Sequence, residues 1–263
     1  MYFMRRTCAF DSLASILLTA ALDDRNYYLF LEQAENSFSS FFLKFVETGV
    51  TTELYKERFL LLKPLYESTE SVTSIQNLAF VTSYDATDNS TDLWTKLFEA
   101  HPSTFHTSVC EICNGDGEHN YTIQIDHAVI PQHGFKALQK ALDFHPVIYN
   151  KPCICGFQCT ETSVGNNHIF VELGTRTHYD APPLRTRLNN FPVELTLDCK
   201  YRLVGVINEQ EDHFTSYCRR ASGYWQEYDD VRSLIRQCKP EEEIHPIGEI
   251  YIKKIPANMN TDK

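Results

Sequence analysis

The chain lacks the features by which nucleic-acid-binding and membrane-spanning proteins are most easily recognised. No run of Lys or Arg is longer than a pair, and 35 acidic against 24 basic residues give a formal net charge of −11. Such a composition offers no electrostatic footprint for a nucleic acid or an anionic membrane. No apolar stretch reaches the roughly 18–20 residues that a membrane-spanning helix needs. We therefore expect neither a nucleic-acid partner nor a membrane segment.

An even set of cysteines and any internal repeat are also missing. Nine cysteines in 263 residues argue against a full disulfide framework, and their close pairs are typical of metal sites in a reducing compartment. We therefore expect an intracellular protein of the cytoplasm or nucleus. Hydrophobic residues make up 43% of the chain, which is enough for a sizeable core in one large domain or two small ones.

The opening segment, MYFMRRTCAFDSLASILLTAALDD, admits two interpretations. A basic pair at 5–6, apolar residues over 12–22 and small residues at 19–21 are typical of a secretory signal. In a secreted protein the Asn-x-Thr/Ser triplets at Asn89 and Asn120 would also be acceptors for N-glycosylation.

Helical periodicity favours the other interpretation. At about 100° per residue the polar side chains form one narrow stripe opposite the apolar ones; the polar set is Asp11, Ser12, Ser15 and Thr19, and the apolar set is Phe10, Leu13, Ile16, Leu17 and Ala20. We predict an amphipathic helix over residues 9–22 that faces a core.

Cys8 lies at the start of this helix. There, unpaired backbone N–H groups and the helix dipole stabilise a thiolate, so we expect a lowered pKa and a nucleophilic role for Cys8. The alternative is a small buried residue without chemistry. A matching base further along the chain would favour catalysis.

The rest of the chain changes from helical to strand patterns near residue 105. Apolar spacing predicts helices over 27–47, 53–63 and 91–100, with a looser polar segment over 68–90. Strands are predicted over 105–110, 121–125, 168–173, 193–197, 201–208, 214–220, 224–228 and 249–255, with a short helix over 135–142. The order indicates an α+β fold, a helical lobe followed by a mixed sheet.

A candidate base lies in DHFTSYCRRASGYWQEYDD, residues 212–230. His213 opens one predicted strand and Asp229 follows the next, so a hairpin that turns at 220–223 can bring them together. A carboxylate would fix the imidazole tautomer and leave the other ring nitrogen to take a proton from a thiol. The alternative is a surface histidine, with Asp229 and Asp230 capping a helix over 231–237.

Two cysteine pairs predict a metal site. Cys110 and Cys113 are separated by two residues, and Cys153 and Cys155 by one, with Gly156 next. Two thiolate pairs on separate turns are what a tetrahedral structural zinc requires. Cys159 competes with Cys153 or Cys155 as the fourth ligand; the alternative is a set of free buried thiols.

Two boxes carry a family resemblance. Thr7-Cys8-Ala9-Phe10-Asp11-Ser12 resembles the N-T-C-Y-x-N-S cysteine box of ubiquitin-specific proteases. YRLVGV from residue 201, His213-Phe214 and GYWQEYDD over 223–230 resemble their histidine box, and EIYIKKI resembles their closing strand. The resemblance spans nearly the whole chain. It implies one catalytic domain, 1–263, with a papain-like fold: a helical thumb over 1–103, zinc-bearing fingers over 104–165 and a strand palm over 166–263.

The resemblance also implies a function. A cysteine isopeptidase, or deubiquitinase, would cleave after the C-terminal Gly-Gly of ubiquitin or a ubiquitin-like modifier, with that modifier and its conjugates as partners. Cys8 would be the nucleophile, His213 the base and Asp229 its orienting acid, with Asp230 as the substitute acid. The zinc-binding cysteines would join the fingertips that cradle ubiquitin in the family.

Three positions depart from the family pattern. Phe3 stands five residues before Cys8, where the family usually has an Asn that helps bind the oxyanion. Asp11 replaces another usual Asn, as in the ubiquitin-specific-peptidase-like SUMO isopeptidases, and Asp212 replaces a usual Gly. Two alternatives therefore stay open: a SUMO-specific isopeptidase, and a weak or inactive module of the same fold that only binds the modifier.

Overall fold

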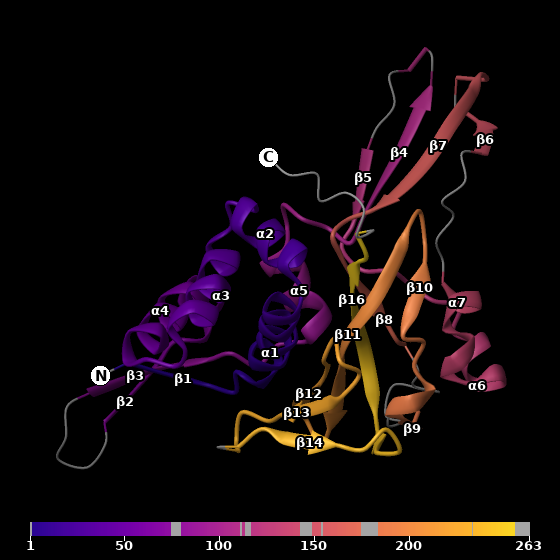
Figure 1. The fold of residues 1–263 in the computed structure, drawn as a ribbon. Helices are drawn as coiled ribbons and strands as arrows, with labels where there is room; N and C mark the ends of the chain where they lie inside the picture. Colours follow the sequence, from indigo (N-terminus) through magenta and orange to yellow (C-terminus); the bar gives the residue numbers. More distant parts are fainter. Residues whose placement is uncertain are drawn as a thin grey trace, which may run out of the picture.

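The longer helices gather in an N-terminal lobe beside a sheet-rich body (Figure 1). The computed structural model describes residues 2–74, 80–110, 112–113, 117–142, 149–153, 155–174, 184–232 and 234–255. The lobe contains α1 (Cys8–Asp23), α2 (Arg25–Gln33), α3 (Ser37–Thr48), α4 (Thr52–Leu62), the 3₁₀ turn η1 (Lys63–Thr69) and α5 (Ser90–Leu97). A small sheet beside it pairs β3 (Phe80–Asp85) with β1 (Tyr2–Arg5), parallel, and β2 (Ser71–Ser74), antiparallel.

The main sheet forms the body of the molecule. Its antiparallel order is β14 (Arg236–Cys238), β13 (Trp225–Tyr228), β12 (His213–Arg219), β11 (Lys200–Gln210), β16 (Pro246–Lys253) and β8 (His168–Glu172), with β10 (Glu194–Thr196) also on β11. A minor pair joins β9 (Thr186–Arg187) to β15 (Glu243–Ile244), next to η3 (Leu188–Asn190).

A second, narrower sheet projects from this body (Figure 1). Its order is β5 (Gly117–Asn120), β4 (Thr104–Cys110), β7 (Gln158–Gly165) and β6 (Tyr149–Pro152). Short helical turns lie between its strands in sequence: α6 (Val129–His133), η2 (Phe135–Ala137) and α7 (Leu138–Ala141). The architecture confirms the predicted α+β class. No helix in the described part of the chain is long and apolar enough to cross a membrane.

The structure corrects three predictions about local elements. The helix predicted over 27–47 is two helices, because the Asn36 side chain accepts from Phe38 N and starts α3 anew. The strand predicted over 121–125 is only two isolated bridges, because Ile123 pairs with Val171 and Ile125 with Leu142. The polar segment over 68–90 contains β2 and β3, which its composition did not indicate.

Helix α1 is the centre of the fold, and its buried surface is wider than the periodicity predicted, because only Asp11 and Ser15 of the predicted polar stripe stay partly exposed. Its polar residues Ser12 and Thr19 are only 3% exposed, as buried as its apolar ones. The Ser15 and Thr19 hydroxyls donate to backbone carbonyls one turn earlier, which satisfies them without water. A helix buried over so much of its surface needs neighbours on more than one side.

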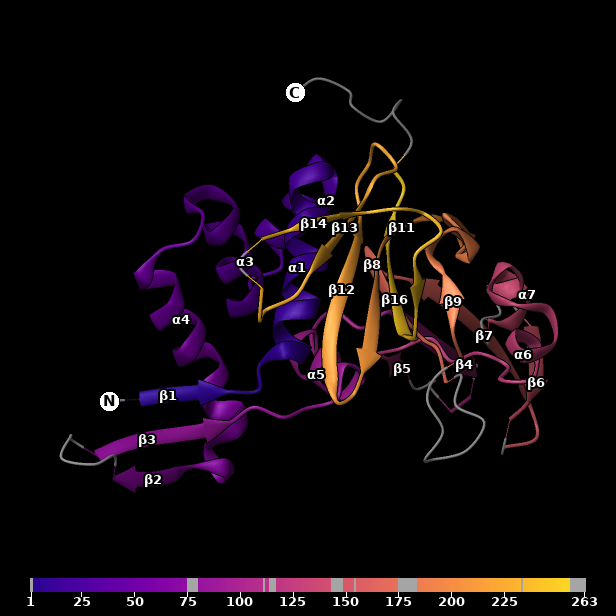
Figure 2. The ribbon, with the colours of Figure 1, turned by 90° about the horizontal axis from the view of Figure 1, so that it is seen from below.

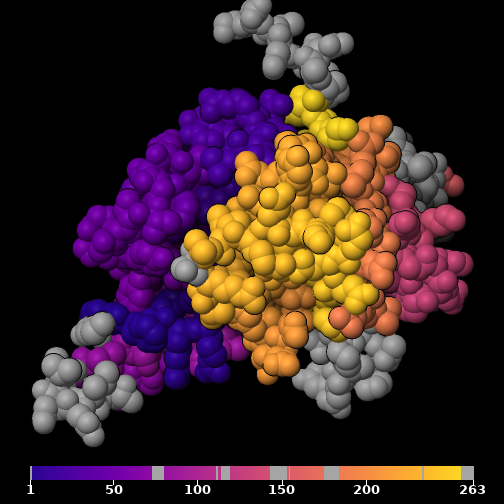
Figure 3. Space-filling model, turned by 60° about the horizontal axis from the view of Figure 1, so that its bottom comes forward, coloured from indigo at the N-terminus to yellow at the C-terminus, as the bar shows by residue number. Residues whose placement is uncertain are grey.

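Those neighbours include the helical lobe on one side and strands β11 and β12 on the other (Figure 2). Gly205 in β11 makes the approach possible, because a Cβ there would lie 2.5 Å from Ile16 Cγ1. At the far end of α1, the Asp23 carboxylate accepts a hydrogen bond of 2.8 Å from Nε of Arg220, which lies in the turn after β12. Figure 3 shows the seam along which the indigo and purple lobe meets the orange and yellow sheet.

We predict that Gly205→Ala destabilises the protein by about 1–3 kcal/mol, because the added methyl overpacks the contact with Ile16. Urea unfolding of wild type, Gly205→Ala, Ile16→Ala and the double variant measures the coupling. The cost of Gly205→Ala should be smaller in the Ile16→Ala background. An equal cost in both backgrounds would show that the close approach is not the cause.

Candidate active site and metal centre

Cys8 is the first residue of α1, and contacts from the helical lobe brace this end of the helix. The Thr7 hydroxyl donates to Asp11 Oδ2 at 2.7 Å. The Arg58 guanidinium, from α4, donates to Asp11 Oδ1 at 2.6 Å. The Asp11 that replaces a family Asn is therefore held by a cation from a neighbouring helix, and the turn that carries Cys8 is fixed in place.

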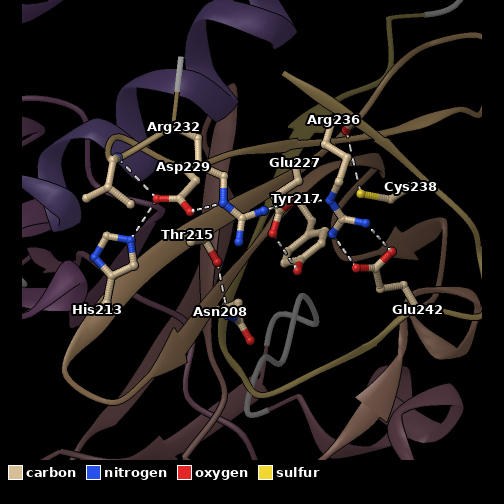
Figure 4. A network of polar contacts seen from close by, with 11 residues as sticks. Asn208, His213, Thr215, Tyr217, Glu227, Asp229, Arg232, Arg236, Cys238 and Glu242 are labelled. Atoms are coloured by element: carbon tan, nitrogen blue, oxygen red, sulfur yellow. Dashed lines mark hydrogen bonds and ion pairs between the residues drawn. The ribbon is translucent and has the colours of Figure 1, made fainter. Parts of the chain in front are cut away.

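His213 and Asp229 meet as their spacing predicts. The β12–β13 hairpin closes at Gly223, whose φ of 92° favours glycine and whose N–H donates to Arg220 O at 2.9 Å. His213 Nε2 lies 2.9 Å from Asp229 Oδ1 (Figure 4). It lies 3.6 Å from Asp230 Oδ1. With Nε2 donating to the carboxylate, Nδ1 is the ring nitrogen that can accept a proton.

The alternative interpretation of Asp229 as the cap of a helix is wrong. Arg232 N donates to Asp229 O at 3.0 Å and closes a β-turn, and Val231 N donates to Asp229 Oδ1 at 3.2 Å. Strand β14 then begins at Arg236. This turn also places a residue that the sequence did not single out: Arg232 Nε lies 2.9 Å from Asp229 Oδ2. The sequence analysis considered a helix over 231–237, so no signal in the sequence pointed to Arg232.

The Cys8 thiol does not have the lowered pKa that a helix start predicts. Burial raises its pKa, a backbone hydrogen bond from Phe214 lowers it in part, and the nearby Asp230 charge raises it again. Among the described residues no hydrogen bond joins Cys8 to His213. The helix start alone therefore does not activate this thiol, and its reactivity requires a base.

The residue five before Cys8 supplies no oxyanion donor from its side chain. Phe3 lies in β1, opposite Ser83 of β3, with an apolar ring that is 52% exposed. A ring without N–H or O–H groups cannot take over the role of the family Asn. With Phe3 at this position, the sequence leaves the oxyanion to the Cys8 backbone N–H and to a further donor that it does not identify, and this stays a prediction.

The four predicted zinc ligands lie together near the tip of the narrow sheet. Cys110 ends β4 and Cys113 follows it; Cys153 follows β6 and Cys155 precedes β7. The sulfur atoms lie within 4.8 Å of one another, with Cys110–Cys155 at 3.5 Å and Cys113–Cys153 at 3.8 Å. A tetrahedron with Zn–S bonds of about 2.3 Å has edges of about 3.8 Å.

This group could therefore bind zinc, and no disulfide competes with it, because all nine cysteines are free. Cys159 lies opposite Cys110 in the β4–β7 register but is not a member of the group. A bound zinc ion would join the turn after β4 to the turn before β7 and so stabilise the tip.

Comparison with known proteins identifies the fold. No protein-family model matches the chain. The solved structure of the SAGA Ubp8/Sgf11/Sus1/Sgf73 DUB module is similar, with a TM-score of 0.57 and 11% identity over 95% of this chain and 66% of that one. The structure of the same module bound to ubiquitin aldehyde is similar with a TM-score of 0.50 and 11% identity, and the match covers 95% of this chain and 68% of that one. The chain has a fold like that of ubiquitin-specific proteases, with a helical lobe, a main sheet and a narrower sheet that projects from it.

Among curated proteins, the chain is similar to the 120.7 kDa protein in the NOF-FB transposable element of Drosophila melanogaster. The two are 23% identical over 251 residues. The match covers 86% of this chain and 22% of that protein, so the chain spans about a fifth of its relative's length.

We predict that Asp230→Asn makes Cys8 about 2- to 5-fold more reactive at pH 8, because it removes a nearby negative charge that disfavours the thiolate. Iodoacetamide labelling, followed by mass spectrometry of the Cys8 peptide, measures the rate. Asp198→Asn, a carboxylate outside the candidate active site, should leave that rate unchanged. A rate in Asp230→Asn at or below that of wild type would contradict the charge effect.

We also predict about one zinc per chain, lost in Cys113→Ser, because three remaining thiolates bind zinc more weakly than four. Elemental analysis of protein purified without chelator measures the content. Cys199→Ser, outside the group, is the matched control and should keep its metal. Metal-free wild type, or a Cys113→Ser variant with full zinc content, would show that these four cysteines do not form a zinc site.

Proposed function

We propose that the chain is a thiol isopeptidase, a deubiquitinase that cleaves after the C-terminal Gly-Gly of ubiquitin or a ubiquitin-like modifier. The observation that carries this proposal is the packing of α1, which begins at Cys8, against the strand that begins at His213, whose imidazole meets a carboxylate at 2.9 Å. The solved structure with ubiquitin aldehyde supports ubiquitin as the first modifier to test.

Each side chain has a defined part in the proposed reaction. His213 Nδ1 accepts the proton of the Cys8 thiol, and the sulfur attacks the carbonyl carbon of the modifier's last glycine. The C–N bond then breaks, and the imidazolium returns its proton to the leaving lysine amine. Water, deprotonated by the same imidazole, hydrolyses the thioester. Asp229 holds the ring and stabilises its positive charge; Asp230, at 3.6 Å, is the substitute acid.

In the same proposal the chain forms a single catalytic domain with three parts. Residues 1–103 would form the thumb with the nucleophile, 166–263 the palm with the base and acid, and 104–165 the zinc-bearing fingers. The position of the four cysteines near the tip of the narrow sheet supports a structural role for zinc in the fingers, away from the reacting groups.

A second candidate is a module that binds the modifier without cutting it. Two observations favour it: burial raises the pKa of Cys8, and Phe3 offers no oxyanion donor. Loss of one such donor costs roughly a hundredfold or more in rate. The two candidates share the fold and differ only in chemistry at Cys8.

Two electrophilic probes separate these candidates: ubiquitin and SUMO, each with a reactive group at its C-terminus. We expect the ubiquitin probe to label wild type and Cys199→Ala but not Cys8→Ala, with circular dichroism showing that all three are folded. Labelling by the SUMO probe alone would identify SUMO as the modifier that the enzyme recognises. Saturable ubiquitin binding without labelling would overturn the enzyme and leave the binding module.

A further inference from the structure

A continuous network of charges lies behind the His213–Asp229 pair, and it extends the proposed active site, on which this inference rests (Figure 4). The Asp229 side chain is only 6% exposed. Its Oδ1 accepts from His213 and from Val231 N, and its Oδ2 faces Arg232 Nε at 2.9 Å. Both carboxylate oxygens are therefore occupied, and the carboxylate cannot turn without breaking a charge-assisted bond.

Arg232 is itself held by a second buried carboxylate. Its Nη1 lies 3.3 Å from Glu227 Oε2, and Glu227 in β13 is 7% exposed. Arg236 Nε reaches the same oxygen at 2.5 Å, while Tyr217 donates to Oε1 at 3.1 Å. Glu227 and Arg236 are register partners on neighbouring strands, so the sheet fixes both.

Arg232 differs from these partners in what holds it. It lies in the turn between β13 and β14, outside the strand register, and 56% of its side chain is exposed. Its contact with Glu227 therefore links that turn to the sheet, and its contact with Asp229 holds the carboxylate within the turn. Because a buried charge that loses its partner is costly, the network favours one arrangement of Asp229.

The network also distinguishes the two candidate acids. Asp229 receives the Arg232 and Val231 contacts, whereas the only ion pair of Asp230 in the described chain is the 3.6 Å approach to His213. We infer that Arg232 is a positioning residue that selects Asp229 as the acid behind His213, and that Glu227 holds Arg232 in place. In this role Arg232 acts through its contact with Asp229.

Steady-state cleavage of a ubiquitin C-terminal aminocoumarin amide tests the inference. We expect Arg232→Gln to lower kcat about 5- to 20-fold with KM within twofold of wild type, and Arg232→Lys to recover part of the loss by restoring the charge. Glu227→Gln should have a smaller effect in the same direction. Arg185→Gln breaks a comparable exposed pair, Arg185–Glu243 at 3.0 Å, and should change nothing.

A second readout needs no turnover. The His213 Nε2–H proton, assigned in NMR spectra by its loss in His213→Ala, should exchange faster with solvent in Arg232→Gln but not in Arg185→Gln. If wild type cleaves no modifier and this proton still responds, the positioning role stands and the proposed function fails. If Arg232→Gln changes neither the proton nor kcat, the inference is overturned.

Discussion

The packing of α1 against β11 and β12 is the constraint on which the rest of the structure depends. It holds only because Gly205 leaves room for Ile16. The same contact sets the distance between the helix that begins at Cys8 and the strand that begins at His213. Asp23, at the other end of α1, binds Arg220 in the turn after β12. The proposed nucleophile and base therefore belong to two elements that are joined at both ends.

Burial and nearby charges act differently on the two sides of this junction, at Cys8 and at Asp229. Burial and the Asp230 charge keep Cys8 protonated, while the backbone of Phe214 offers a hydrogen bond to the thiolate. On the other side, Arg232 and Glu227 hold the Asp229 carboxyl group against His213. The arrangement suits a thiol that gains its charge by proton transfer to an oriented imidazole, rather than one ionised beforehand.

Much of the site was predictable from sequence because its members are close in the chain or share regular spacing. The His213–Asp229 hairpin follows from two strand patterns around a glycine turn, and the cysteine group from its paired spacing. The raised pKa of Cys8 was not predictable, because burial comes from distant segments. Arg232 was missed because the pattern around it was compatible with a helix. The β1–β3 pairing was missed because its strands are short and far apart in the sequence.

The most direct test of the central claim is to map which residue a ubiquitin C-terminal electrophile modifies, and how fast, in wild type, Asp229→Asn and Asp230→Asn. The structure predicts that Cys8 alone among the nine cysteines is modified, and that the rate falls at least about tenfold in Asp229→Asn but not in Asp230→Asn. Modification spread over other cysteines, or equal rates in all three proteins, would contradict it.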